Sequence, residues 1–179
     1  MLILCTTLML AALAGLHMVE EKDTGTLHAL RVTPPSVSGL AAYRGGTVSA
    51  VTLAYVAAAL AISGPFDTRL LPAILAAGLC AGLLTAMIMA LLTLVSATKL
   101  EAIAHLKIVA MLVAAPPAAA WFIPAPAQYL FAVLPTYWPV KIYWIAIDDG
   151  TAWPYALIGT TYCALLLLLL LATINRRLG

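Results

Sequence analysis

Charged residues are scarce in this chain of 179 residues. It contains nine Lys or Arg and seven Asp or Glu, together 9% of the sequence, whereas a soluble domain usually carries roughly 25%. So few charged side chains cannot cover the surface of a soluble globule of this length. Intrinsic disorder is excluded as well, because 64% of the residues are hydrophobic. The net charge of +2 is too small to argue for a nucleic-acid partner.

Patterns typical of metal binding and catalysis are also missing. The three cysteines, Cys5, Cys80 and Cys163, lie in separate apolar runs without metal-ligand spacing, so we expect small buried hydrophobic residues rather than a zinc site or a disulfide. Without a Gly-rich phosphate loop, the chain is not expected to hydrolyse ATP itself. Glu101 and His105 do not match the zinc-binding His-Glu-x-x-His pattern; a charge cluster at the membrane edge is favoured over a proton relay. We therefore predict no catalytic residue, no metal and no cofactor.

Long charge-free windows occupy most of the chain and predict an all-α integral membrane protein. A bilayer core of about 30 Å requires about 20 helical residues. A charge at the centre of a membrane helix costs about 2.5–3.5 kcal/mol, so the charged run Glu20–Asp23 is expected to end the first span near Val19. We predict a single permease-like domain, 1–179, with about five spans over residues 1–19, 41–63, 72–96, 102–122 and 154–174.

Prolines concentrate in the window 108–140, which is too long for one span. Because interior prolines remove helix hydrogen bonds, we expect a break near Pro116–Pro117. A broken, partly re-entrant segment is expected to follow over residues 125–147, since irregular backbone at membrane depth needs protein or water around it.

The distribution of Lys and Arg predicts the orientation of the spans. Seven of these residues follow the first, third and fifth spans or their neighbouring segment, and two lie on the opposite side. Positive residues favour the cytoplasm, so segment 20–40, the turn 97–101 and the C-terminus are placed there, in a cell membrane of bacterial type. The N-terminus would lie outside. Because no Lys or Arg precedes Lys22, residues 1–19 are expected to be a span rather than a signal peptide, and an outside start suggests a missing upstream segment.

The charged segment after the first span predicts a short amphipathic helix over about 20–33. Leu27 and Leu30 share one face at helical spacing, and Pro34 ends the helix. From the residue pattern alone, a solvated interfacial helix is favoured. Docking of the two leucines into a groove of a soluble partner is the alternative.

The same segment resembles the coupling segment of ABC-2 type transporter permeases. The pattern is Glu-x-x-x-Gly-Thr-Leu-x-x-Leu-x-x-Thr-Pro, and the following order of spans agrees over nearly the whole chain, including the stretch Leu134–Pro139 before the last helix. The resemblance implies an export permease for a small molecule, working as a homo- or heterodimer with a separate ATP-binding cassette subunit. It assigns ATPase coupling to Glu21, Gly25, Thr26, Leu27, Leu30 and Pro34. Lys99–Ala102 and the stretch 134–138 further resemble fluoroquinolone-export permeases.

Two departures from that family leave other functions open. Such permeases usually have six spans and an amphipathic N-terminal helix, whereas this chain shows neither the first span nor that helix, and His28 stands where an acidic residue is common. The alternative is a truncated, non-transporting membrane protein or an assembly partner. A third hypothesis is an intramembrane enzyme that uses Glu101, His105 or the pair Asp148–Asp149.

Three further patterns have a structural and a functional interpretation. Gly78 and Gly82, four residues apart, predict close helix packing, either between subunits or within the chain. Asp148–Asp149 is expected to form an outer turn that caps the approach to the last helix. Aromatic residues near the predicted outer surface favour interfacial anchoring over guidance of an apolar or cationic-amphiphilic substrate; they are Tyr137, Trp138, Tyr143, Trp144, Trp153 and Tyr155.

Overall fold

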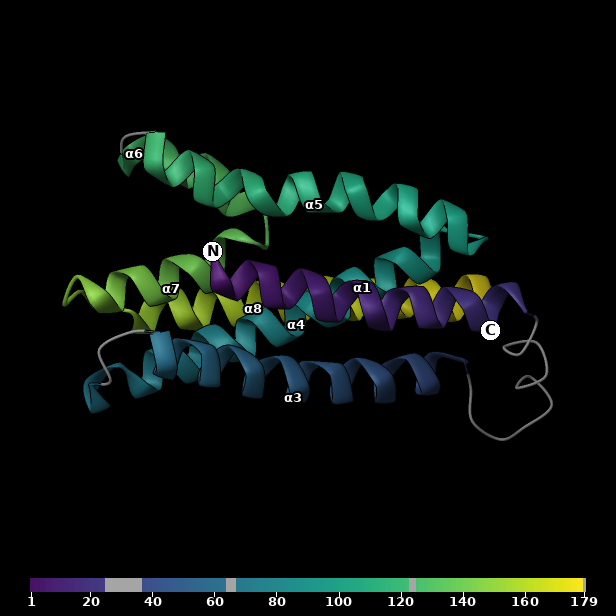
Figure 1. The fold of residues 1–179 in the computed structure, drawn as a ribbon, viewed down its shortest axis with the longest axis horizontal. Coiled ribbons are helices and arrows are strands. Elements are labelled where there is room, and N and C mark those ends of the chain that lie inside the picture. Colours follow the sequence, from purple (N-terminus) through teal and green to yellow (C-terminus); the bar gives the residue numbers. More distant parts are fainter. Residues whose placement is uncertain (25–36, 64–66, 123–124, 179) are drawn as a thin grey trace.

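The chain folds into a bundle of long helices that run roughly parallel to one axis (Figure 1). The computed structural model describes residues 1–24, 37–63, 67–122 and 125–178. All elements in these ranges are α-helices or short 3₁₀ helices, and no strand occurs in them. The predicted all-α membrane protein is therefore confirmed. The long helices are α1 (Leu2–Asp23), α3 (Val37–Ser63), α4 (Leu71–Val95), α5 (Lys99–Phe122) and α8 (Trp153–Leu178).

Four helical segments of the described chain are long and apolar enough to cross a membrane. They are Leu2–Asp23, Gly39–Ile62, Thr68–Val95 and Trp153–Arg176. The predicted span 102–122 falls within α5, which is not among these four, and it stays a prediction. Helix α1 continues through the charged run to Asp23. The end of the first span near Val19 concerns the membrane boundary and stays a prediction.

Helix α4 lies at the centre of the bundle, with α1, α3, α7 and α8 packed around it. Its sequence is apolar on every side, which is typical of a helix that is buried all round. Leu84, Met89 and Leu92 are completely enclosed. Helix α5 lies to one side of the other helices (Figure 1) and contacts mainly α1.

Small residues let α4 and α3 approach closely. A Cβ atom added at Gly82 would lie 2.6 Å from the backbone oxygen of Ser49, and one at Gly78 would lie 3.3 Å from that of Leu53. The Ser49 hydroxyl donates a 2.8 Å hydrogen bond to the Gly82 carbonyl, and the Thr52 and Thr85 hydroxyls are 3.1 Å apart. The glycine pair thus faces α3 of the same chain, so this surface is not free for a second subunit.

Replacing Gly82 by Ala is expected to destabilise the bundle. The new methyl group meets a backbone oxygen that cannot rotate away, and overpacking of this kind costs about 1–3 kcal/mol. Gly46→Ala is the matched control on α3, since a Cβ at Gly46 meets no atom within 4 Å. Thermal unfolding of the purified protein in detergent should show a lower midpoint for the first variant alone. Equal midpoints for the two variants would contradict the close α3–α4 approach.

The segment between α5 and α8 is broken, as predicted for residues 125–147. It consists of α6 (Ala125–Gln128), η3 (Tyr129–Val133) and α7 (Tyr137–Ile147). Its re-entrant insertion into a membrane stays a prediction. The expected break at Pro116–Pro117 is wrong, because α5 continues to Phe122. Each proline removes one hydrogen bond, and the remaining bonds of a helix of 24 residues keep it continuous.

Aromatic side chains connect this broken segment to its neighbours. Trp138 Nε1 donates a 3.0 Å hydrogen bond to the Ala132 carbonyl, and the Tyr162 hydroxyl donates one of 2.7 Å to the Val133 carbonyl. The acceptors are backbone oxygens of η3, so Trp138 and Tyr162 hold this short helix against α7 and α8.

Two of the three cysteines are buried as predicted. Cys80 on α4 and Cys163 on α8 are fully buried, with their Sγ atoms 3.7 Å apart. Cys5 is exposed, so its predicted burial is wrong. The proximity of the other two, 83 residues apart in sequence, depends on α4–α8 packing and has no local signal.

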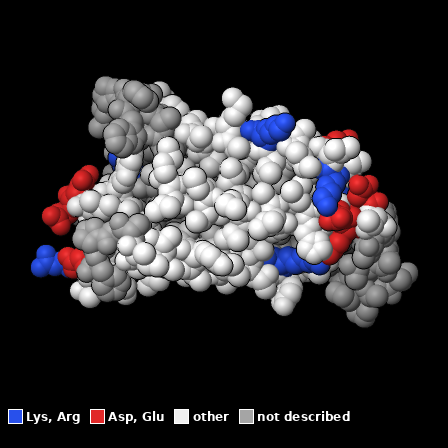
Figure 2. All heavy atoms as spheres, in the orientation of Figure 1, with Lys and Arg blue, Asp and Glu red and all other residues white. Residues whose placement is uncertain are grey.

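Most charged side chains lie toward the two ends of the bundle, with an uncharged stretch between them, and one Lys or Arg side chain lies on the upper edge nearer the middle (Figure 2). At one end, named the clamp end, the last turn of α1 meets the start of α3 and the turn between α4 and α5. At the other, the pocket end, η2 (Thr68–Leu70) and the start of α4 meet the end of α7 and the start of α8. This distribution is the one that a bilayer requires.

Candidate functional site

The last turn of α1 carries four consecutive charged residues, Glu20 to Asp23, at the clamp end. Successive helical residues point about 100° apart, so these side chains spread around the helix and reach different neighbours. Three connections start from this turn. Together the residues that make them, Glu20, Glu21, Lys22, Arg44 and Lys99, are called the clamp.

Glu21 connects α1 to α3. Its Oε1 lies 2.7 Å from Nη2 of Arg44, and the two side chains are only 17% and 29% exposed. Arg44 also places Nη1 3.4 Å from the Met18 sulfur. Removing the carboxylate from a half-buried guanidinium is expected to destabilise the fold. The guanidinium would still be partly removed from water, but it would no longer be attracted to a negative charge. This ion pair joins the two helices that flank residues 25–36.

Lys22 connects α1 to the end of α4. Its Nζ donates hydrogen bonds to the backbone carbonyls of Thr93 (3.0 Å) and Ser96 (2.8 Å). The last carbonyls of a helix lack hydrogen-bond donors within that helix, and they lie at the negative end of its dipole. A lysine ammonium at this position donates hydrogen bonds to the carbonyls and its positive charge is favourable for the dipole. The contact ties α1 to the α4–α5 turn.

The α4–α5 turn is itself cross-braced. Glu101 Oε2 accepts a 2.7 Å hydrogen bond from the backbone N–H of Ala97, and His105 Nδ1 is 3.0 Å from the Ser96 hydroxyl. Lys99 Nζ lies 3.0 Å from Glu20 Oε2 in an exposed ion pair. Glu101 and His105 thus have structural partners, and no cluster of three metal-ligand side chains occurs in the described residues.

The structure places only part of the predicted coupling site. Glu21 belongs to the last turn of α1 and faces Arg44. The other coupling residues, Gly25, Thr26, Leu27, Leu30 and Pro34, lie outside the described residues. Residues 25–33 of the predicted helix 20–33 also lie outside the described residues. Residues 20–23 of that predicted helix form the last turn of α1.

Sequence reasoning missed the partners of this turn. Arg44 is 23 residues from Glu21 and lies on the next helix, and the carbonyls that bind Lys22 belong to α4. A usable signal existed for Arg44, which is the single charged residue between 37 and 66 in an otherwise uncharged predicted span. A lone charge so near a span end favours an ion pair with the adjacent charged run.

The predicted turn at Asp148–Asp149 is present, but neither carboxylate caps α8. No hydrogen bond or ion pair of these two side chains occurs with any residue that the structure describes. Asp149 instead lines a pocket between η2, α4, α7 and α8. The capping prediction is therefore wrong, because α7 ends in its own C-terminal turn before α8 begins.

Comparison with known proteins identifies the family of the chain. The family described as "Fluoroquinolones export permease protein Rv2686c-like" matches residues 1–171. Two relatives from Mycobacterium tuberculosis, fluoroquinolones export permease protein MT2760 (strain CDC 1551 / Oshkosh) and fluoroquinolones export permease protein Rv2686c (strain ATCC 25618 / H37Rv), are each 37% identical over 161 residues. The match covers 90% of this chain.

The same match covers 64% of each relative, so the chain spans slightly less than two thirds of the length of these curated relatives. No solved structure matches. The family match extends over nearly all of the described bundle, from α1 into the last turns of α8. The chain belongs to the Rv2686c-like family of fluoroquinolones export permease proteins.

Proposed function

We propose that the chain is the transmembrane permease subunit of an ATP-driven ABC-2 type exporter, with ATP bound and hydrolysed by a separate subunit. The proposal is supported by the family membership and by the coupling-type motif from Glu21 to Pro34. The single observation that carries it is the clamp. The ion pair Glu21–Arg44 joins the helices on both sides of the motif, so a force on residues 25–36 reaches two membrane helices at once.

In this proposal the clamp transmits closure of the ATP-binding subunit as a rigid-body movement. Leu27 and Leu30 dock in a groove of that subunit. Glu21 passes the movement to α3, while Lys22 and Glu20 pass it to the ends of α4 and α5. These contacts join α3, α4 and α5 to α1. The four helices therefore move together.

The proposal includes an orientation and partners. The clamp end faces the cytoplasm, since Lys22, Arg44 and Lys99 gather there and positive residues favour that side. The C-terminus of α8 is then cytoplasmic, and the pocket end faces outward across a bacterial cell membrane. Two permease chains, identical or different, form the pathway. The substrate is a small amphiphilic molecule, and a fluoroquinolone is the first candidate because the curated relatives are named for these drugs.

Co-expression with a candidate ATP-binding subunit, sought in the reading frames next to this gene, tests this function. We expect cells that carry both subunits to accumulate less norfloxacin than cells that carry either alone. A Walker-A lysine substitution in the partner should abolish the difference. Equal accumulation in all strains, although both proteins reach the membrane, would favour the alternative of a non-transporting assembly partner.

A further inference from the structure

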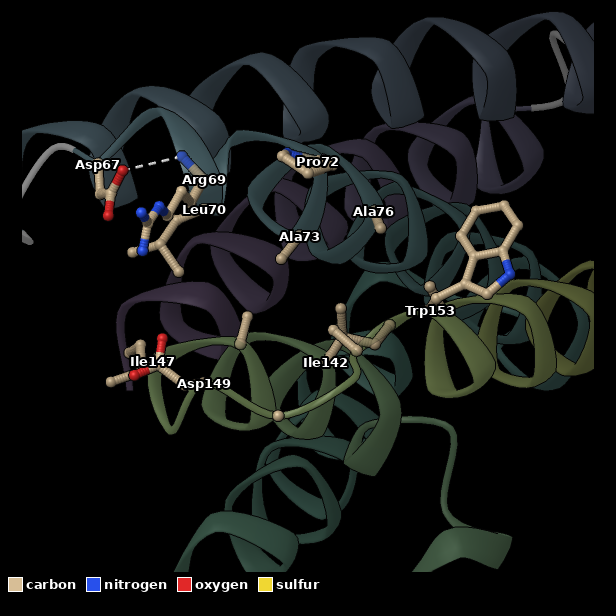
Figure 3. A pocket seen from close by; sticks show the side chains of 14 residues that line it. Asp67, Arg69, Leu70, Pro72, Ala73, Ala76, Ile142, Ile147, Asp149 and Trp153 are labelled. Atoms are coloured by element: carbon tan, nitrogen blue, oxygen red, sulfur yellow. Dashed lines mark hydrogen bonds between the residues drawn. The ribbon is translucent and has the colours of Figure 1, made fainter.

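A cavity of about 640 Å³ opens at the pocket end, between the start of α4 and the ends of α7 and α8 that meet there (Figure 3). Its size lies within the roughly 300–1,000 Å³ typical of sites for drug-sized ligands. Small side chains create it: Ala73 and Ala76 of α4 face Ala146 of α7 and Ala156 of α8. A cavity so lined is apolar along most of its length.

Charged groups occur at one part of this pocket. Figure 3 shows Asp67 and Arg69 on one wall and Asp149 on the facing wall, with the indole of Trp153 at the other side. Two carboxylates and one guanidinium give the lining a formal charge of −1. An apolar pocket with a net negative end suits a ligand that has an apolar body and a positive group.

The two carboxylates have different tasks. Asp67 Oδ1 accepts a 3.0 Å hydrogen bond from the backbone N–H of Arg69, so it caps η2 and lies in the same wall as the Arg69 side chain. Asp149 makes no hydrogen bond or ion pair with any described residue. Asp149 is thus the carboxylate available to a ligand.

The backbone of Asp149 is in a conformation that few residues other than glycine adopt, Asn and Asp being the main exceptions. It has φ 54°, in the left-handed region that favours glycine. The N–H of Gly150 donates a 2.8 Å hydrogen bond to the Ile145 carbonyl, which is the six-to-one bond of a Schellman motif, and Asp149 occupies the place where glycine is usual. A negative residue at a helix C-terminus is also unfavourable for the helix dipole. A carboxylate that is unfavourable for the helix dipole thus lines the cavity.

We propose that this pocket binds an amphiphilic organic cation, with its protonated amine against Asp149 and its apolar or aromatic part along Ala76, Ile142 and the Trp153 indole. The carboxylate attracts the protonated amine, and the indole offers an apolar face to the rest of the ligand. The assignment of such cations as exported substrates that occupy this outward site rests on the proposed function. Binding itself does not require transport.

Binding of matched fluorescent probes tests the inference. The full chain is reconstituted in phosphatidylcholine nanodiscs, and dansylcadaverine, its neutral N-acetyl derivative and anionic dansyl-aminohexanoate are titrated by fluorescence anisotropy. We expect the cation to bind about fivefold more tightly than the neutral probe, a ratio at the upper end for a partly exposed ion pair. The anion should bind most weakly.

Asp149→Asn should remove the preference for the cation and leave the affinity for the neutral probe unchanged. Asn tolerates the left-handed backbone, so the variant is expected to fold. The matched control is Asp148→Asn, which removes the adjacent carboxylate outside the pocket lining and should behave as wild type. Ala76→Phe should weaken binding of all three probes by filling the cavity. Equal affinities of wild type for the cationic and neutral probes would overturn the inference, and so would equal effects of the two Asn variants.

The outcomes separate this inference from the proposed function. Charge-selective binding that depends on Asp149, together with a failure to export norfloxacin, would count against the exporter alone. Export that is unaffected by Asp149→Asn, with no charge selectivity in nanodiscs, would overturn the pocket inference alone.

Discussion

Replacing both Leu27 and Leu30 by Asp is expected to release the ATP-binding subunit from the permease while the helical bundle stays folded. Burial of one leucine side chain contributes about 1.5–3 kcal/mol, so the loss of two should weaken the contact by a hundredfold or more. The measurement is co-purification of the ATP-binding subunit with a tagged permease from detergent-solubilised membranes. Transport of norfloxacin should be lost as well.

The matched control for this double variant is Ser36→Asp, which adds a negative charge beyond Pro34 and outside the predicted helix 20–33. It should leave co-purification intact. Undiminished recovery of the ATP-binding subunit with the double Asp variant would contradict docking by the two leucines. An equal loss with both variants would show a general effect of charge in this segment.

Breaking the clamp at Glu21 is expected to have the opposite combination of effects. Glu21→Gln leaves the half-buried Arg44 without its carboxylate, which costs about 1–3 kcal/mol and loosens α1 from α3. The ATP-binding subunit should still co-purify, because the two leucines are untouched. Transport per ATP hydrolysed should fall about tenfold, since part of the movement no longer reaches α3. The measurement is norfloxacin uptake into inverted vesicles together with ATP hydrolysis.

Two further variants test the role assigned to Glu21. Exchange of the charges, Glu21→Arg with Arg44→Glu, should restore part of the lost coupling. His17→Gln is the control, because His17 is 68% exposed and its Nδ1 lies 3.9 Å from Glu21 Oε1, too far for a strong contact. Unchanged transport in Glu21→Gln would show that the ion pair does not carry the movement. A loss of co-purification would place Glu21 in the docking surface instead.

Charge positions were enough to predict most of the helices. The predicted spans 41–63 and 72–96 agree closely with α3 and α4, because a membrane helix tolerates few charges and both windows contain at most one. The same rule does not indicate where α1 ends, because the helix continues beyond the predicted span to Asp23. The charged residues of its last turn have partners on other helices, Glu21 on α3 and Lys22 on α4. Those partners come from tertiary packing, which no local pattern contains.

The candidate sites were less accessible to sequence reasoning. The resemblance to ABC-2 type permeases predicts that Glu21 belongs to a coupling segment, but it does not indicate the ion pair with Arg44. Asp149 was interpreted as a capping residue, because its left-handed backbone and the alanine-lined cavity beside it arise only when α4, α7 and α8 are assembled. Similarly, Gly78 and Gly82 predicted a close helix contact without indicating that α3 of the same chain fills it.

Site-specific photo-cross-linking tests the central claim most directly, namely that segment 20–34 contacts the ATP-binding subunit. A benzoylphenylalanine residue is introduced at Leu27, and at Ile62 as the control, since Ile62 is 86% exposed at the pocket end of α3. The account predicts a cross-link to the ATP-binding subunit from position 27 and none from position 62. Absence of that cross-link from position 27, with the two subunits still co-purifying, would contradict it.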